Sequence, residues 1–241
     1  MADSTPEELA KTLWFPRWFD DPHISNASYL GIDLYEAFPP DQRAEMIETV
    51  RKSRLAIKEQ GRQAFVEGDA IGFLASASNT YSMVMVYENV LPLVKRGIYE
   101  QALLDAITAT RTNNRHWSLR AFRDLFRWAN RAKLLAAGDP LPGPGPFTLY
   151  RGVAGTTDRA RRVRGISWTG TLAQAAWFAD RGWGLANPEV YKCVVDAKHV
   201  LSHVGSHRNE DEYIVLLPRS ATVERVALPL PEPTVKGKGV Q

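Results

Sequence analysis

A run of proline and glycine constrains the fold of this 241-residue chain more than any other segment. Residues 138–146 read Gly-Asp-Pro-Leu-Pro-Gly-Pro-Gly-Pro. Proline has no N–H to donate to a helix or to a central strand, so four prolines this close together exclude both elements. The run is therefore predicted to be an extended connector between two differently built parts.

The part before the connector, residues 1–137, carries helical patterns and is predicted to be a helical domain. A first long helix is expected to begin at Pro39-Pro40, because proline suits a first helical turn, and to stop at Gly61. The cluster Trp14–Phe19 precedes it and is interpreted as a core plug or a docking patch rather than a binding site. Further helices are expected over 64–76, 81–95, 99–110 and 118–136.

The part after the connector, residues 147–228, changes to short apolar runs typical of strands. A helix is expected over 171–181, because Thr171 and Gln174 form a capping-box pattern. A polar loop is expected around 202–209, and the tail 229–241, rich in Pro, Lys and Gly, is predicted to be disordered. The fold class is therefore α+β, with strands expected over 147–152, 165–169, 190–196, 212–217 and 221–228.

Composition excludes several classes of protein. A hydrophobic content of 44% fills a core, and a net charge of +3 does not by itself indicate a nucleic-acid binder. The single cysteine, Cys193, leaves no disulfide framework and no cysteine-based metal site. His199, His203 and His207 would share a face only on a helix, and their surroundings are strand-like, so no metal is expected. The sequence shows no secretory signal and no membrane span, which predicts a cytoplasmic protein, in its own cell or delivered into a target cell.

Two acidic residues mark the start of one predicted strand. Glu210 and Glu212 lie two positions apart before the apolar run 213–217. Alternate strand residues face the same way, so the two carboxylates would point off one face, roughly 7 Å apart. Two like charges at the mouth of a core strand repel each other. Paired carboxylates of this kind are what glycosyl-transfer chemistry uses.

Two other strands carry residues that suit an anionic ligand. Tyr150-Arg151-Gly152 ends one strand, where an arginine offers a planar fork to phosphate and a glycine lets a ligand approach the backbone. Ser167-Trp168-Thr169 forms another, with both hydroxyls on one side and the indole on the other. Each feature alone is common on ordinary surfaces. Their order along the chain, an arginine strand, then Ser-x-Thr with a helix, then Glu-x-Glu with an apolar strand, is much more specific.

This order resembles the R-S-E class of mono-ADP-ribosyltransferases, which includes the cholera-toxin-like and clostridial binary toxins. The resemblance covers about residues 147–228. The family's arginine motif matches Tyr150-Arg151-Gly152, its Ser-Thr-Ser motif matches Ser167-Trp168-Thr169, and its Glu-x-Glu motif matches Glu210-Asp211-Glu212. The central tryptophan departs from the best-known toxins. Together with Trp177-Phe178-Ala179 it looks like bacterial and phage domains in which Ser-Trp-Thr precedes a helix.

The resemblance implies a split two-sheet fold that binds NAD as substrate, without a metal. Arg151 would hold a phosphate of NAD or its nicotinamide-side ribose, and the Gly152 backbone would meet the carboxamide. Ser167 would orient Glu212, and Thr169 would support the strand or the pocket. The resemblance also draws further residues into the NAD site: Tyr150, Trp168, Phe178 and, in a phosphate–nicotinamide loop, Arg181.

The chemistry that these residues would perform follows from the bond to be broken. Cleavage of the nicotinamide–ribose bond builds positive charge on the sugar, which Glu212 would stabilise. Glu210 would act as general base toward the acceptor, and a glutamate in that place goes with arginine acceptors in the family. The predicted function is mono-ADP-ribosylation of a macromolecule, with protein favoured over nucleic acid. The alternatives are modification of RNA or DNA, NAD hydrolysis, and an inactive module that only binds a partner.

Two basic clusters leave the role of the remaining surface open. One basic cluster lies at 159–164, and the other lies on the last predicted helix. Both are interpreted as solvated or interdomain faces, or as surfaces for nucleic acid or an acidic partner. The helical domain would recognise the target, control access to the site or bind a neutralising partner. The second basic cluster belongs to the last predicted helix and consists of Arg115, Arg120, Arg123, Arg127, Arg131 and Lys133.

Overall fold

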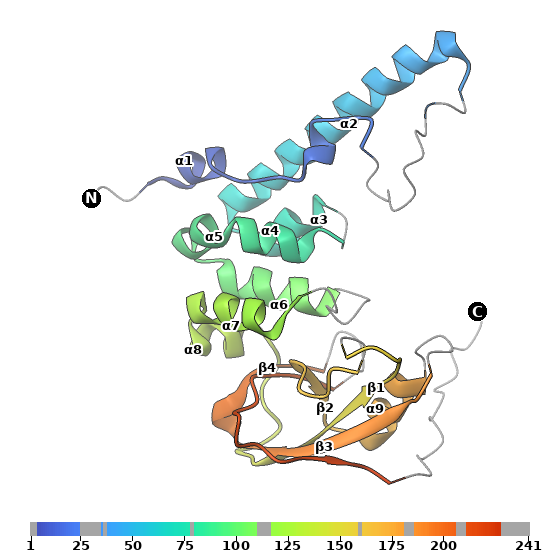
Figure 1. Cartoon of the computed structure of the whole chain (residues 1–241). Coiled ribbons are helices and arrows are strands. Elements are labelled where there is room, and N and C mark those ends of the chain that lie inside the picture. The colour runs from blue at the N-terminus through green and yellow to red at the C-terminus, as the bar shows by residue number, and fades with distance from the viewer. Residues whose placement is uncertain are drawn as a thin grey trace, which may run out of the picture. The chain divides into compact units, whose positions relative to one another are not determined.

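The chain folds into two compact units, residues 1–111 and 112–241 (Figure 1). The described elements of the first unit are helices, and the second unit combines helices with an antiparallel sheet. The class is α+β, as predicted. The division falls earlier than the boundary expected at 137/138. The computed structural model describes residues 4–24, 35, 38–77, 80–109, 117–158, 161–180, 186–205 and 211–227.

The described secondary structure of the first unit consists of helices. Its longest helix, α2, is the blue helix that projects furthest in Figure 1. The elements are α1 (Pro6–Lys11), the 3₁₀ turn η1 (Arg17–Phe19), α2 (Pro40–Glu67), α3 (Ala70–Ala75), α4 (Ser82–Glu88), α5 (Val90–Arg96) and α6 (Tyr99–Ala109).

Helix α2 passes through Gly61, where the sequence predicted its end, and stops at Gly68 instead. Gly61 is buried, and a Cβ there would lie 2.5 Å from the Ser76 hydroxyl, so this glycine serves close helix packing. Gly68 adopts φ +86° and its N–H caps the helix end, which is the conformation that glycine adopts without strain. The helix expected over 64–76 is thus divided at Gly68.

The predicted helix 81–95 is also divided, because Asn89 separates α4 from α5. Its fully buried carboxamide accepts from Trp14 N (2.7 Å) and donates to Trp14 O and Met85 O (2.9 Å each). Pro92, three residues on, has no N–H to give to a continuous helix. Asn89 thereby ties the N-terminal segment to the helices.

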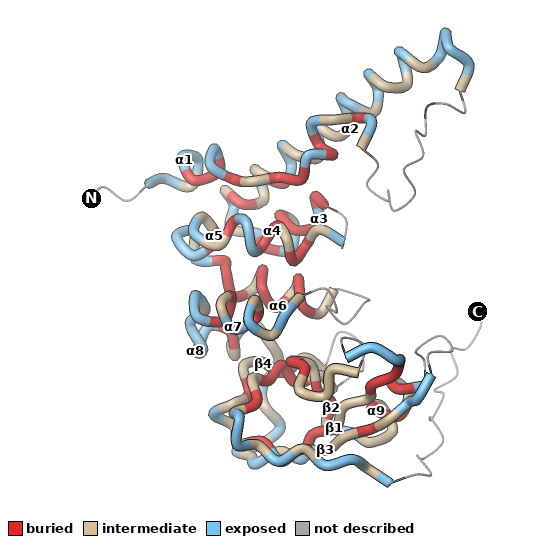
Figure 2. Tube along the Cα trace, in the orientation of Figure 1, coloured by how far each residue is buried: buried red, intermediate tan, exposed pale blue. Residues whose placement is uncertain are grey.

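The aromatic cluster is a core plug, one of the two roles expected for it. Phe15, Trp18 and Phe19 are all buried, as the red segment beside α2 in Figure 2 indicates. Arg54, on α2, donates from one nitrogen to the carbonyls of Trp18 (2.6 Å) and Asp21 (2.7 Å). The segment is therefore held on α2 by aromatic packing and by one arginine.

The second unit begins with two short helices and continues with a sheet. The single helix predicted over 118–136 breaks at Ala129, which is extended, and Asn130 caps the second helix through its side chain. The elements are α7 (Leu119–Trp128), α8 (Arg131–Ala136), β1 (Phe147–Val153), β2 (Ser167–Thr169), α9 (Leu172–Asp180), β3 (Glu189–Val195), η2 (Ala197–His199), β4 (Val200–Val204), β5 (Glu212–Val215) and β6 (Val223–Arg225).

The described strands form one six-stranded sheet in the order β4-β5-β2-β1-β3-β6, with antiparallel pairing throughout. The resemblance led us to expect two separate sheets, whereas the described strands pair into a single sheet. The two three-stranded halves join only where β1 meets β2, at the single pair Tyr150↔Thr169. The sheet therefore has a narrow seam in its middle.

Each face of the sheet has its own apolar cluster. Helix α9 covers β1 and β3, where Ala175, Ala176 and Ala179 pack on Val190. The other cluster is larger and is built around Trp168, Leu149 and Tyr213. The small alanine side chains bring α9 close to the sheet.

The Pro/Gly run is part of the second unit and not a connector between the two units. Helix α8, which precedes the run, packs against β4, and Arg131 donates to Ala197 O (2.7 Å) and Val200 O (3.1 Å). Asp139 N donates to His203 O (2.8 Å), and Gly205 N donates to the Asp139 carboxylate (2.6 Å). These bonds attach the run to the sheet edge.

The loop predicted around 202–209 is a strand in its first part. Ser202 and His203 lie in β4 and are buried between β5 and the Pro/Gly run. Polarity indicated a loop, whereas strand pairing and the covering run bury both side chains. Residues 206–210 and the tail expected to be disordered lie outside the described residues. Among the helices that are described, none is long and apolar enough to cross a membrane.

Replacement of Asn89 by alanine is expected to lower the free energy of unfolding by about 2–4 kcal/mol. It removes three hydrogen bonds and leaves the Trp14 amide groups without this partner in a buried place. Urea unfolding followed by circular dichroism measures the change. Glu88→Ala, at the exposed neighbouring position, is the control and should change stability by less than about 0.5 kcal/mol. Equal effects of the two substitutions would contradict this role for Asn89.

Candidate functional site

A hollow at the seam of the sheet brings together residues from three separate parts of the sequence. It contains about 310 Å³ of empty space, part of it open to solvent. Its lining comes from β1, β2, α9 and β5, and consists of Tyr150, Arg151, Gly152, Ser167, Trp168, Thr169, Phe178 and Glu212. All eight were predicted as site residues. The other two, Glu210 and Arg181, lie outside the described residues.

Ser167 and Glu212 are joined directly. Antiparallel pairing of β2 with β5 sets Ser167 opposite Ile214 and Thr169 opposite Glu212. The Ser167 hydroxyl donates to Glu212 Oε1 at 2.5 Å. A serine on the neighbouring strand therefore fixes the orientation of the carboxylate.

Arg151 lies beside this pair and connects three segments. From β1 it donates through Nε to Arg162 O (3.0 Å) and through Nη1 to Ser167 O. Burial, followed by the nearby charge of Arg162, lowers the pKa of Arg151 to about 10, and Glu212 acts in the opposite direction. The guanidinium is thus still charged at neutral pH. Among the described residues, two backbone carbonyls accept from its five N–H groups, and Arg151 also lines the hollow.

Gly152 has a different structural reason from the one predicted. A Cβ at this position would lie 2.0 Å from Ala175 O and 2.6 Å from Ala179 N. The glycine therefore makes room for helix α9. Its backbone remains part of the lining of the hollow.

Gly165 was missed by the sequence analysis as a site residue. A Cβ there would lie 2.4 Å from Arg151 Nη2 and 2.5 Å from the central guanidinium carbon. The flat guanidinium thus rests on a residue without a side chain. A glycine two residues before Ser167 is the available signal, but the sequence does not tell which side chain lies over it.

The remaining predicted residues lie at the hollow in different ways. The Trp168 indole is buried in the core, and its Nε1 donates to Gly165 O (2.9 Å). Thr169 is buried, and its hydroxyl accepts from Thr171 N at 3.4 Å, where α9 begins. Tyr150 packs beside the alanines of α9, and Phe178 is a half-buried residue of α9 itself.

Asp211, the middle residue of the Glu-x-Glu motif, is held in an unusual backbone conformation. Its φ of 44° lies in the left-handed region, which non-glycine residues seldom adopt. His203 Nε2 lies 2.8 Å from its carboxylate, while His203 Nδ1 lies 3.1 Å from Pro140 O. Gly170 N donates to Asp211 O (3.2 Å). These contacts set the direction in which the chain enters β5 at Glu212, and the sequence analysis did not find them.

The basic cluster at 159–164 is used inside the protein. Its described arginines each bond to the surrounding chain: Arg161 to the Glu189 carboxylate, Arg162 to Trp117 O (2.6 Å) and Arg164 to Pro218 O. Glu189 also accepts from the Tyr191 hydroxyl (2.8 Å) and pairs with Arg225 (3.1 Å). The loop that offers the Arg162 carbonyl to Arg151 is therefore anchored at several points. The interpretation as a nucleic-acid surface does not fit these three arginines.

The charges around the hollow favour an anion. Arg151 and Glu212 both line the hollow, and the charge of the nearby Arg162 adds to that of Arg151. In the part of the chain that is described, no cluster of three histidine, cysteine or acidic residues could hold a metal ion.

No family model matches the chain, and no curated protein or solved structure is similar enough to match it.

Gly152→Ala is expected to destabilise the protein by about 2–3 kcal/mol, near the upper end for overpacking, because the new methyl group meets backbone atoms of α9. Gly143→Ala is the matched control, since nothing lies within 4 Å of a Cβ there, and it should change stability by less than about 0.5 kcal/mol. Urea unfolding of both variants measures the difference. A Gly152→Ala protein as stable as the control would contradict the close approach of α9.

Glu189 should make stability depend on pH in the acidic range. The hydrogen bond from Tyr191, followed by that from Arg161, lowers the pKa of Glu189 below its ordinary value of 4.5. A carboxyl whose pKa is lowered by folding adds stability above the unfolded value, and this is lost as pH falls through the folded value. The advantage of the wild type over Glu189→Gln is therefore expected to be full above pH 4.5 and to shrink below it. Melting temperatures of both proteins between pH 7 and pH 3 test this, and a difference that stays constant with pH would refute it.

Proposed function

We propose that this protein is a mono-ADP-ribosyltransferase that moves ADP-ribose from NAD to a protein arginine and releases nicotinamide. The observation that carries the proposal is the hydrogen bond from Ser167 to Glu212 in a hollow that Arg151 also lines. Three motifs separated in the sequence meet there in the combination that the R-S-E resemblance implies. A dinucleotide has an anionic pyrophosphate, which agrees with Arg151 in the lining and with the positive charge of Arg162 close to it.

The proposed reaction depends on charge stabilisation by Glu212. Loss of nicotinamide leaves positive charge on the ribose, and a fixed carboxylate stabilises this charge as it develops. The Ser167 hydroxyl donates a hydrogen bond to Oε1 of Glu212, so the carboxylate is already oriented before NAD binds. Less reorganisation is then needed when the bond breaks.

Arg151 has a second role in the proposal besides contact with a phosphate. It bonds to the carbonyl of Ser167, so it positions the strand that carries the hydroxyl. The same guanidinium would then both attract the substrate and hold the Ser167–Glu212 pair in place. The base that would activate the acceptor, Glu210, is proposed from the sequence motif alone.

Glu212→Gln is expected to lower the rate of nicotinamide release from NAD by about 10²-fold or more, because the amide carries no charge to stabilise the sugar cation. Glu224→Gln makes the same chemical change on the exposed strand β6 and should keep the wild-type rate. The assay is release of labelled nicotinamide in the presence of a cell lysate, with circular dichroism to verify the fold.

The fate of the labelled ADP-ribose separates the candidate reactions. Label that becomes protein-bound and protease-sensitive supports transfer to protein. Free ADP-ribose as the sole product would instead point to hydrolysis, and nuclease-sensitive label to a nucleic-acid acceptor. A wild-type protein that leaves NAD intact under all conditions would refute the proposed function.

A further inference from the structure

The exposed side of helix α7 carries an unbalanced set of basic residues. Phe122, Leu125 and Phe126 are buried and fix the inner side of the helix. The residues that remain outside are Arg120, Arg123, Arg127 and Trp128, which together we call the α7 basic face.

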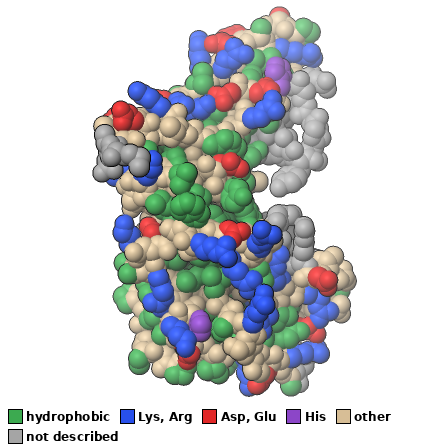
Figure 3. Space-filling view, turned by 60° about the vertical axis from the view of Figure 1, so that its left-hand side comes forward, with side chains coloured by type: hydrophobic (Ala, Val, Ile, Leu, Met, Phe, Trp, Pro, Cys, Tyr) green, Lys and Arg blue, Asp and Glu red, His purple; other side chains and the backbone are tan. Residues whose placement is uncertain are grey.

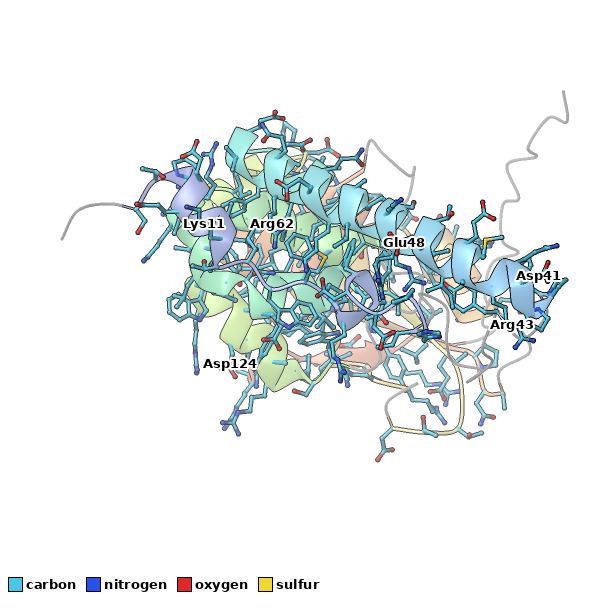
Figure 4. The ribbon with its side chains drawn as sticks, turned by 90° about the horizontal axis from the view of Figure 1, so that it is seen from above. Lys11, Asp41, Arg43, Glu48, Arg62 and Asp124 are labelled. Carbon is cyan, nitrogen blue, oxygen red and sulfur yellow. The ribbon has the colours of Figure 1, made fainter. Side chains whose placement is uncertain are left out.

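One carboxylate is present among these cations. Asp124 lies 2.7 Å from Arg127 and 3.9 Å from Arg120, and it is the sole acidic residue between Trp117 and Gly138. Figure 4 shows Asp124 at the outer side of α7. Figure 3 shows Lys and Arg side chains, in blue, spread over one side of the molecule, with acidic ones, in red, between them. The face thus keeps a surplus of positive charge.

Helix α2 shows what a solvated face of this chain is like. Glu48 pairs with Arg51 and Lys52, and Glu59 pairs with Arg62, at the spacings of one helical turn. Its five acidic residues nearly match its six basic ones. The α7 basic face lacks this balance, so ordinary solvation does not account for it.

Trp128 distinguishes the α7 basic face further. Half of its surface, 51%, is exposed, although a tryptophan side chain gains a large free energy from burial. Arginine and tryptophan are the residue types most enriched at the energetic centres of protein interfaces, where lysine is depleted. The composition of this face is therefore that of a surface for a protein partner.

The face is connected to the hollow through one residue. Arg162 donates to the carbonyl of Trp117, directly before the Ser118 cap of α7, and its own carbonyl accepts from Arg151. A protein docked along α7 would thus lie next to Trp117, which holds Arg162, the residue whose carbonyl accepts from Arg151. The basic cluster at 159–164 does not extend the face into a track for a nucleic-acid backbone, because Arg161, Arg162 and Arg164 are bonded internally.

We propose that the α7 basic face docks an acidic surface of the protein whose arginine is modified. This inference rests on the proposed function and adds the class of acceptor: a folded protein with acidic residues beside the target arginine. Charge complementarity would steer the acceptor to the enzyme, and Trp128 would supply apolar contact at the centre of the interface. A small acceptor that lacks such a surface would not use the face.

The test compares two acceptors with the full-length protein. Transfer from labelled NAD is measured to the proteins of a cell lysate and, separately, to free L-arginine. The test variant carries Arg123→Glu, Arg127→Glu and Trp128→Ala. The control variant carries Arg51→Glu and Lys52→Glu on α2, which makes the same change of charge on a balanced face.

For the test variant we expect protein labelling to fall by about 10-fold or more, as when residues at the energetic centre of an interface are replaced. Its transfer to free arginine should stay within about twofold of the wild type. The control variant should keep both activities. Three results would overturn the inference: equal protein labelling by the test and control variants, equal loss toward both acceptors, or label that nuclease removes. A wild type that labels neither acceptor would instead refute the proposed function, and this inference with it.

Discussion

The buried guanidinium of Arg151 is the interaction on which the site depends most. The two halves of the sheet share one residue pair, Tyr150↔Thr169, so strand pairing alone joins them weakly. Arg151 extends from β1 across this seam to the carbonyls of Ser167 and Arg162. A buried charge is costly unless hydrogen bonds and opposite charge compensate it, and the two carbonyls and the nearby Glu212 supply part of this compensation. The same requirement keeps the seam in one geometry.

Three glycines let the segments around the seam come close enough for these bonds. Gly152 admits the backbone of α9, Gly165 lies under the guanidinium, and Gly170 lies against Asp211. At each position a Cβ would stand within 2.5 Å of another atom. The narrow construction has a consequence for chemistry, because small displacements of any of these segments would move Ser167 relative to Glu212. A site of this kind is preorganised by packing rather than by the ligand.

The parts of this fold that sequence could predict are those set by local chemistry. The strands of the second unit follow from apolar runs in the sequence. Helix α9 follows from its Thr171 cap, whose hydroxyl accepts from Gln174 N as the capping pattern predicted. Arg151, Ser167 and Glu212 could be selected because their motifs occur in a specific order. The helix break at Asn89 could not, because it depends on Trp14, a partner far away in the sequence. Gly61 packs against Ser76 inside the helix, a distant contact that the sequence does not reveal, whereas Gly68 ends α2.

The two basic clusters show the same limit for function. Both are runs of arginine with few acidic neighbours, and sequence assigned both the same set of roles. In the loop before β2, carbonyl groups and Glu189 lie within reach, so Arg161, Arg162 and Arg164 become supports of the loop. On α7 the side chains of Arg120, Arg123 and Arg127 are exposed, and Asp124 is the carboxylate that pairs with Arg120 and Arg127 among the described residues. Three exposed arginines that share one carboxylate keep donors for an external acceptor, so the contrast between loop and helix favours the α7 cluster for recognition of a partner.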